Sequence, residues 1–256
     1  MNQEVCNSIE TSISAHRLST YLNHSSIGTK KIAIANYVLN AKIAENFYFL
    51  LQNLEVSLRN AIYDGFKKHY STSDFFYTSS TNSRDRYLER REKHSRECWK
   101  MLCGAKYKLR HLTHITDGKI IAELNFGFWT ELLLSRNSKY TNMWRRIFID
   151  VFPNYDIRRS VDADKVIIAT LLNSTRKFRN RIFHYEPIFN LPNLEDIHKD
   201  IIAVLGWINK DMQELSILFD SFKSIQLEKQ FITKQLKDKT LSGKKNRRKR
   251  FKINSK

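Results

Sequence analysis

The sequence predicts an all-α protein, and three observations support this prediction. Only seven glycines and three prolines occur among 256 residues, so residues that interrupt helices are scarce. Straight-chain residues that favour helices are abundant. Apolar residues recur at intervals of three and four along much of the chain, as one face of a helix requires. We expect a helical bundle over residues 1–240, with additional helices at both ends, and a basic tail without fixed structure over residues 241–256.

The first half of the chain predicts two long helices separated by a loop. Residues 30–68 contain apolar side chains mostly three or four positions apart, which is typical of a buried helical stripe. Residues 70–83 are rich in Ser, Thr, Tyr and Asp, which indicates a loop. The strongly charged residues 84–111 predict a helix packed along one edge only. Apolar periodicity returns over residues 119–134, whose aromatic side chains could stack bases but are more strongly expected in the core.

The second half predicts three further helices. A short helix is expected over residues 143–151. Ser160 should cap the next helix, because acidic residues follow in the first turn, where the helix dipole favours them. Pro187 disfavours helical geometry in the residue before it, so this helix should stop just past His184. One more helix is expected over residues 194–222.

The formal charge of +18 makes nucleic acid the leading partner. The last thirteen residues hold eight Lys or Arg and no acid, which still leaves +10 on the remainder. An acidic membrane or simple solubility could also account for a basic surface, but no membrane-spanning run or signal peptide is visible. The three cysteines are too few for a disulfide framework, which fits a cytoplasmic protein. Cys98 and Cys103 have the spacing C-x4-C, and His111 and His114 have the spacing H-x2-H. Neither is a usual spacing of zinc ligands, so no metal site is expected.

The most informative string runs from Arg179 to His184 and has the pattern R-N-x-x-x-H. A histidine can transfer a proton near neutral pH, and an arginine can hold a phosphate through a rigid fork. Those are the tools needed to cut an RNA backbone. On a regular helix Asn180 and His184 share a face, which Arg176 extends by one turn. Arg179 lies about 140° away from His184, so a shared site requires a loosened last turn or a substrate that approaches between the two faces.

The pattern resembles the signature of HEPN domains, a superfamily of helical proteins that includes many microbial ribonucleases of defence and toxin systems. The chain is most similar to the Abi-like branch, the abortive-infection proteins of the AbiD/AbiF type. The resemblance covers residues 15–220 and rests on several motifs in the same order. These are Arg17-Leu18 with Tyr21-Leu22, Leu54–Ile62, Phe126–Leu133 and Arg179–Phe189.

The resemblance implies a metal-independent endoribonuclease without a cofactor, acting in antiphage abortive infection or as a toxin in the bacterial cytoplasm. His184 would act as base or acid, Arg179 would stabilise the phosphate, and Asn180 would orient the histidine or bind the phosphate. Members of the superfamily typically form homodimers in which two motifs face each other. An inhibitory protein or RNA is also implied, because an unregulated ribonuclease kills its host. The alternative is a non-catalytic RNA-binding HEPN protein that regulates or assembles.

Other residues are predicted to contact RNA around the motif and in the tail. They are Arg176, Arg181, Arg59, Asn60, Lys244, Lys245, Arg247 and Arg248. An ordinary intrahelical pair is an equally good interpretation for Arg59, because Glu55 stands four residues before it. For the motif itself, the alternative is a solvated helix end whose cations interact favourably with the helix dipole.

Overall fold

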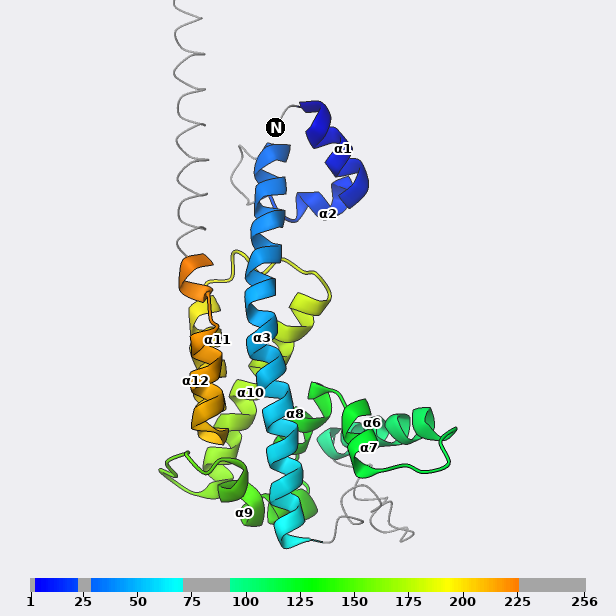
Figure 1. Ribbon diagram of the computed structural model, residues 1–256, viewed down its shortest axis with the longest axis vertical. Helices are drawn as coiled ribbons and strands as arrows, with labels where there is room; N and C mark the ends of the chain where they lie inside the picture. Colours follow the sequence, from blue (N-terminus) through cyan, green and yellow to red (C-terminus); the bar gives the residue numbers. More distant parts are fainter. Residues whose placement is uncertain (1–2, 23–28, 71–92, 226–256) are drawn as a thin grey trace, which may run out of the picture. The chain divides into compact units, whose positions relative to one another are not determined.

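The computed structural model describes residues 3–22, 29–70 and 93–225 (Figure 1). These residues form ten helices and no strand, so the prediction of an all-α protein is confirmed. None of these helices is sufficiently long and apolar to span a lipid bilayer. The chain divides into two compact units, and α3 (Lys30–His69) and α10 (Val161–Phe183) run through both of them.

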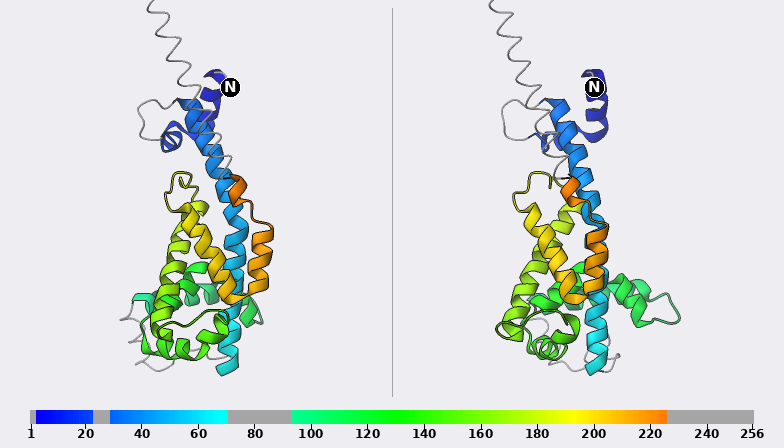
Figure 2. Two further views of the ribbon diagram at one scale, coloured as in Figure 1. Left: turned by 90° about the vertical axis from the view of Figure 1, so that its left-hand side faces the viewer. Right: turned by 60° about the vertical axis from the view of Figure 1, so that its left-hand side comes forward.

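The first unit comprises the described parts of Met1–Tyr48, Arg181–Pro192 and Asp220–Lys256. Besides the N-terminal part of α3 it contains α1 (Gln3–Ile13) and α2 (Ala15–Ser19), which lie beside that part of α3 in both views of Figure 2. The core of this unit is apolar and draws on all three of its segments. Its buried side chains include Leu18, Tyr21, Ile43, Phe47, Ile188, Phe189 and Phe222.

The second unit comprises the described parts of Phe49–Asn180 and Asn193–Phe219. Its further helices are α6 (Lys93–Leu109), α7 (Asp117–Glu123), α8 (Phe126–Leu134), α9 (Ser138–Val151), α11 (Leu194–Ile208) and α12 (Lys210–Leu218). Six of the nine residues of α8 are buried, among them Phe126, Phe128 and Trp129. The expectation that these aromatic residues belong to the core is therefore confirmed.

Capping residues set the boundaries of α10 much as the sequence predicts. The Ser160 hydroxyl accepts a hydrogen bond from the N–H of Ala163 at 3.2 Å, which is the expected N-cap. The Asp164 carboxylate, in the first turn, accepts the N–H of Arg158 at 3.0 Å. The helix ends at Phe183, next to the predicted stop. The long helix predicted over residues 30–68 is also present, as α3.

Two predicted helices differ from the observed ones. The single helix predicted over residues 194–222 is wrong, because Asn209 has an extended backbone (φ −157°, ψ 120°) that separates α11 from α12. Its side chain accepts the N–H of Met212 at 2.9 Å and so begins a new helix. The helix predicted over residues 143–151 begins five residues earlier, after the N-cap Asn137. In both places an asparagine offers the backbone a local hydrogen bond that defines a helix start.

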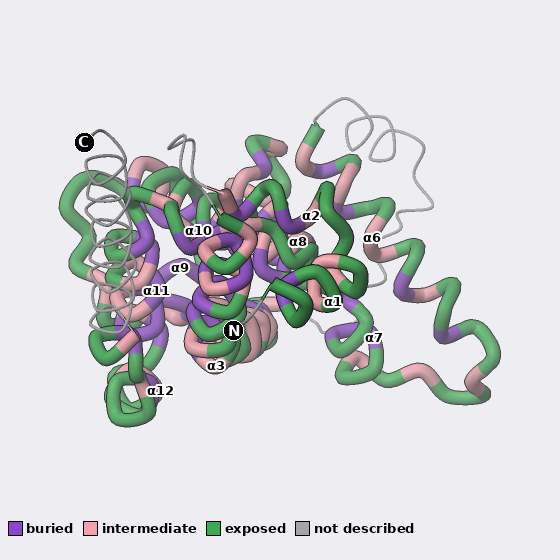
Figure 3. Tube along the Cα trace, turned by 90° about the horizontal axis from the view of Figure 1, so that it is seen from above, coloured by how far each residue is buried: buried purple, intermediate pink, exposed green. Residues whose placement is uncertain are grey.

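The charged helix predicted over residues 84–111 is described from Lys93 onward, as α6. It packs along one edge and exposes the other, as predicted, and Figure 3 shows buried and exposed positions alternating along it. Its buried residues are Ser95, Cys98, Ala105 and Leu109. Beyond residue 70, the predicted loop over 70–83 lies outside the described residues, as does the tail over 241–256.

Candidate functional site

The R-N-x-x-x-H motif lies at the C-terminal end of α10. Arg179 and Asn180 stand near the end of the helix, and both side chains are half-buried. Phe183 is the last helical residue, and the exposed His184 follows it directly. The boundary between the two units falls inside the motif, after Asn180. The two sides of the motif are therefore held by different sets of contacts.

The helix end after His184 is a Schellman motif. The N–H of Glu186 donates to the C=O of Arg181 at 2.8 Å, and the N–H of Tyr185 donates to the C=O of Ile182 at 2.9 Å. Tyr185 has a φ of 55°, in the left-handed region that glycine usually occupies at this position. A side chain in that region costs about 1–2 kcal/mol. Surrounding contacts must therefore hold the backbone in this conformation.

Arg17 and Tyr21 hold Tyr185 in place. Arg17 Nη2 donates to the C=O of Tyr185 at 2.6 Å, and the Tyr21 hydroxyl donates to the same oxygen at 3.2 Å. The Arg17 guanidinium also lies 5.9 Å from the centre of the Tyr185 ring. Both residues belong to the first motif of the sequence resemblance. In this structure the two residues of that motif hold the backbone beside His184 in place.

Asn40 on α3 holds the remainder of the same loop. Its Oδ1 accepts the N–H of Ile188 at 2.6 Å and that of Phe189 at 3.1 Å. Its Nδ2 donates to the C=O of Glu186 at 3.3 Å. Asn36, one turn earlier, donates to a backbone carbonyl after α2 at 2.8 Å. The motifs predicted from the sequence missed both asparagines, although two amides four residues apart within an apolar stripe signal buried polar groups that need partners.

Arg181 closes this loop on itself. Its Nη2 donates to the C=O of Pro187 at 2.6 Å, and its Nε lies 3.4 Å from the carboxylate of Glu186. The guanidinium thus gives the carbonyl of Pro187, in the loop after α10, a hydrogen-bond donor. The structure thereby gives Arg181, which is predicted from the sequence to bind RNA, a role in the conformation of the loop.

Arg179 faces a carboxylate within the second unit. Its Nη2 lies 3.6 Å from Oε2 of Glu55 on α3. Glu55 also accepts a backbone hydrogen bond from Phe126, the first residue of α8. Burial raises the pKa of Glu55, while Arg179, Arg59 and the Phe126 N–H oppose that rise. An anionic group is therefore held here by two arginines and a helix N-terminus, which are groups that also bind phosphate.

The other residues predicted to contact RNA differ in their surroundings. Arg59 is half-buried, and its buried Nε has no hydrogen-bond partner among the described residues. Asn60, next to it, is exposed. Four predicted contacts lie outside the described residues: Lys244, Lys245, Arg247 and Arg248.

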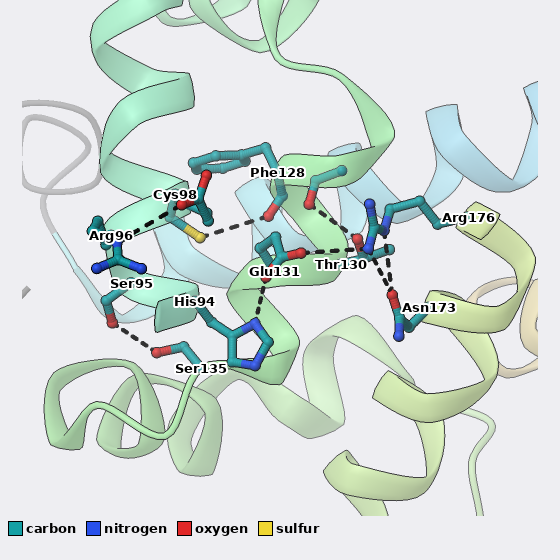
Figure 4. A network of polar contacts seen from close by, with 12 residues as sticks. His94, Ser95, Arg96, Cys98, Phe128, Thr130, Glu131, Ser135, Asn173 and Arg176 are labelled. Carbon is teal, nitrogen blue, oxygen red and sulfur yellow. Dashed lines mark hydrogen bonds and ion pairs between the residues drawn. The ribbon is translucent and has the colours of Figure 1, made fainter. Parts of the chain in front are cut away.

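Arg176 belongs to a polar network that joins α6, α8 and α10 (Figure 4). Glu131 is its centre, because Oε1 lies 3.5 Å from Arg176 Nη2 and Oε2 is hydrogen-bonded to His94 Nδ1. The side chain of Asn173 accepts a hydrogen bond from Arg176 at 2.9 Å. Sequence reasoning did not connect His94 with Glu131, because they stand 37 residues apart and only the packing of α6 on α8 brings them together.

Within the described ranges, no three His, Cys, Asp or Glu side chains gather where they could hold a metal ion. Cys98 is buried, and its Sγ lies 3.9 Å from the carbonyl oxygen of Phe128. Cys103, His111 and His114 are exposed. Of the two cysteines of α6, Cys98 is therefore enclosed by the protein and Cys103 is open to solvent.

Comparison with known proteins gives no family assignment: no protein-family model, no curated protein and no solved structure matches the chain.

Proposed function

We propose that this protein is an endoribonuclease of the HEPN type that acts in antiphage abortive infection or as a toxin. The observation that supports this best is the placement of His184, which is exposed and directly follows α10. The loop after it is held by buried or half-buried polar side chains of Arg17, Tyr21 and Asn40. A histidine on a fixed backbone but open to solvent suits proton transfer with a large substrate.

The proposed chemistry uses the RNA itself as the nucleophile. A base removes the proton of a 2′-hydroxyl, the oxygen attacks phosphorus, and the bond to the 5′-oxygen breaks as that oxygen takes up a proton. The products are a 2′,3′-cyclic phosphate and a 5′-hydroxyl. His184 would serve as the base or the acid, and Arg179 would stabilise the pentacoordinate phosphate. Asn180 would orient the histidine or bind a phosphate oxygen, and the scheme requires no metal ion.

A homodimer would complete this scheme. Two facing motifs would supply one histidine as base and a second as acid, whereas a single chain has one such histidine. The protein would also need an inhibitory protein or RNA, because uncontrolled cutting of RNA harms the cell that makes it. The second copy of the chain and the inhibitor are both part of the proposal. The resemblance implies them, and the need for a base, an acid and a restraint on cutting supports them.

A second candidate, a non-catalytic RNA-binding HEPN protein, is favoured by a different observation. Each of three arginines in and beside the motif is close to a carboxylate. The pairs are Arg176 with Glu131, Arg179 with Glu55, and Arg181 with Glu186. Guanidinium groups paired in this way can serve the fold rather than a reaction. RNA would then bind to the basic surface without being cut.

Cleavage of labelled RNA in the presence of EDTA separates the two candidates. The wild-type protein should cut RNA, and His184→Ala should lower the rate at least about a hundredfold, as removal of a general acid or base does. Because His184 is exposed, the variant should melt within a few degrees of wild type. His114→Ala, which also removes an exposed histidine, should keep full activity. Binding without cutting by the wild-type protein would favour the second candidate.

Arg179 needs a more conservative substitution than alanine. Arg179→Ala would leave the carboxylate of Glu55 without its nearest guanidinium and would lower stability for that reason. Arg179→Lys keeps the charge and removes the two-pronged fork. We expect this variant to fold and to cut RNA at least about tenfold more slowly. An unchanged rate would remove the arginine fork from the mechanism.

A further inference from the structure

The exposed side of α6 carries two parallel rows of residues. The basic row consists of Arg96, Lys100, Gly104 and Lys108, each four positions after the last. The aromatic row consists of Trp99, Cys103 and Tyr107, with the same spacing. All seven residues are exposed. Residues four apart on a helix lie on one face with a rise of about 6 Å between them, so each row follows a line along the helix, and the basic row has a gap at Gly104.

The positive charge of this face is only weakly compensated. Residues 93–111 contain six Lys or Arg and a single acid, Glu97. Lys100 Nζ lies 3.0 Å from a carboxylate oxygen of Glu97, and Lys108 Nζ lies 3.1 Å from one of Glu123 on α7. Ion pairs this exposed contribute little to stability. A phosphate can therefore take the place of either carboxylate at small cost.

The aromatic row presents surfaces on which bases can stack. Tyr107 is 64% exposed and Trp99 is 37% exposed, although both stand on a helix that buries other apolar residues. The Arg110 guanidinium lies 3.6 Å from the centre of the Tyr107 ring, and its Nη1 donates to the Tyr107 carbonyl at 2.7 Å. The ring is thereby held in position, and a planar cation extends the row. Aromatic rings combined with arginine are what single-stranded nucleic acids stack on.

Gly104 stands in the middle of the basic row, and packing against the described residues gives no reason for a glycine there. A Cβ added there would have no atom of the described part of the chain within 4 Å. By contrast, a Cβ added at Gly65 on α3 would meet Val151 Cγ2 at 3.2 Å, so packing explains that glycine. Glycine inside a helix is unfavourable relative to alanine. A ligand that approaches the helix backbone closely would account for the missing side chain between Lys100 and Lys108.

We infer that this face of α6 binds single-stranded RNA, with phosphates along the basic row and bases against the aromatic row. A duplex fits less well, because its bases are already stacked on one another and are not available to Trp99 and Tyr107. The inference takes its substrate class from the proposed ribonuclease function, but it does not require that the RNA be cut. The inference therefore concerns the binding of the RNA substrate, at residues distinct from His184 and Arg179.

The test measures binding of fluorescein-labelled (U)20 RNA by anisotropy, using full-length protein with His184→Ala so that no RNA is cut. Adding Lys100→Glu and Lys108→Glu should weaken binding at least about tenfold and flatten its salt dependence. Lys199→Glu with Lys210→Glu changes the net charge equally at exposed positions of α11 and α12. This control should weaken binding about threefold or less, as loss of general attraction alone would.

Two further variants test the aromatic row and the glycine. Trp99→Ala with Tyr107→Ala should weaken binding at least about tenfold at unchanged charge. Gly104→Gln introduces a long, uncharged side chain into open space on a helix that tolerates it. It should weaken RNA binding about fivefold or more while raising the melting temperature, an outcome that unfolding cannot produce.

The inference is overturned if the two charge reversals on α6 and the two control reversals weaken (U)20 binding equally. It is equally overturned if the Gly104→Gln protein binds (U)20 as tightly as the protein that keeps Gly104. It is also overturned if the α6 variants weaken the binding of two other ligands as strongly as that of (U)20. These ligands are a double-stranded RNA of the same length and polyglutamate, which mimics an acidic protein. Failure of the ribonuclease proposal is recognised separately. In that case the chain with His184 intact would bind (U)20 through α6 and leave it uncut.

Discussion

At the scale of single residues, the polar side chains of Arg17, Tyr21 and Asn40 fix the conformation of the loop that follows the motif. Asn40 alone makes three hydrogen bonds to the backbone of the loop that follows His184. The left-handed backbone of Tyr185 depends on Arg17 and Tyr21 in the same way. Apolar packing surrounds this loop, but the polar side chains select its conformation because each fits one arrangement of donors and acceptors.

Replacing Asn40 with alanine should therefore lower the free energy of unfolding by about 2–4 kcal/mol, because two backbone N–H groups are left buried without acceptors. Urea denaturation measures this change. Asn142→Ala removes an exposed amide of α9 and should change stability by less than about 0.5 kcal/mol. Equal effects of the two substitutions would mean that the Asn40 contacts add nothing to stability.

The pH dependence of stability should report the half-buried position of Glu55. Burial raises the pKa of Glu55 above its ordinary value of 4.5, so the folded protein binds this proton more tightly than the unfolded chain does. The stability that Glu55 contributes is therefore present below pH 4.5 and is lost as the pH rises through the raised pKa. Glu55→Gln cannot lose a proton, so its stability relative to wild type should increase from acidic to neutral pH.

Asp162→Asn is the control of opposite sign. A hydrogen bond from Arg145 lowers the pKa of Asp162 below its ordinary value of 3.8. The stability that Asp162 contributes is present above pH 3.8 and is lost as the pH falls through the lowered pKa. Asp162→Asn should therefore be least stable relative to wild type at neutral pH. A parallel pH course for both variants would contradict the assignment for Glu55.

At the scale of helices, asparagines divide the chain where apolar periodicity alone predicts continuity. The break between α11 and α12 depends on Asn209, whose side chain caps α12, while the backbone of α11 ends at Ile208. Beyond the break, Gln213 on α12 donates to the carbonyl of Ile202 on α11 at 3.0 Å. The cap and this contact together allow the two helices to pack on each other.

Asn209→Ala should destabilise the protein by about 1 kcal/mol, because the N–H of Met212 loses its capping acceptor. Asn193 provides a close comparison, since it precedes α11 in the same way but makes no side-chain capping hydrogen bond. Asn193→Ala should therefore change the melting temperature much less. The interpretation of Asn209 as a cap fails if the two alanine variants melt together.

At the scale of the whole molecule, charge is the property that most strongly favours an RNA partner. The chain carries +18, of which eight charges lie in the last thirteen residues. Each phosphate contact contributes about 0.7 to the slope of log affinity against log salt for a single strand. A basic tail should therefore strengthen binding without taking part in the chemistry.

Truncation after Leu241 should weaken RNA binding and flatten its salt dependence, while some cleavage survives at low salt. Titrations of labelled RNA at several salt concentrations measure both quantities. A tail of equal length with its lysines and arginines replaced by glutamine should behave like the truncation, because charge rather than length is responsible. Unchanged binding in both proteins would exclude the tail from RNA recognition.

Local signals in the sequence were sufficient for several features of this protein. The scarcity of glycine and proline and the three-to-four periodicity predict the all-α class, α3 and the exposed edge of α6, because each depends on neighbours within a few residues. The cap at Ser160 and the end of α10 near His184 also follow from local backbone preferences. The candidate motif is itself a local string of six residues, so the amino-acid sequence is sufficient to propose it.

Only the tertiary structure decided which distant residues surround that motif. Arg17 and Asn40 meet the loop after α10 across 168 and 146 residues of sequence, and Glu131 meets His94 across 37. Such contacts depend on how apolar faces pack, and many packings satisfy the same periodicity. The sequence alone therefore determined the all-α class and the string Arg179 to His184, whereas the fold decided that its arginines face carboxylates and that its histidine is exposed.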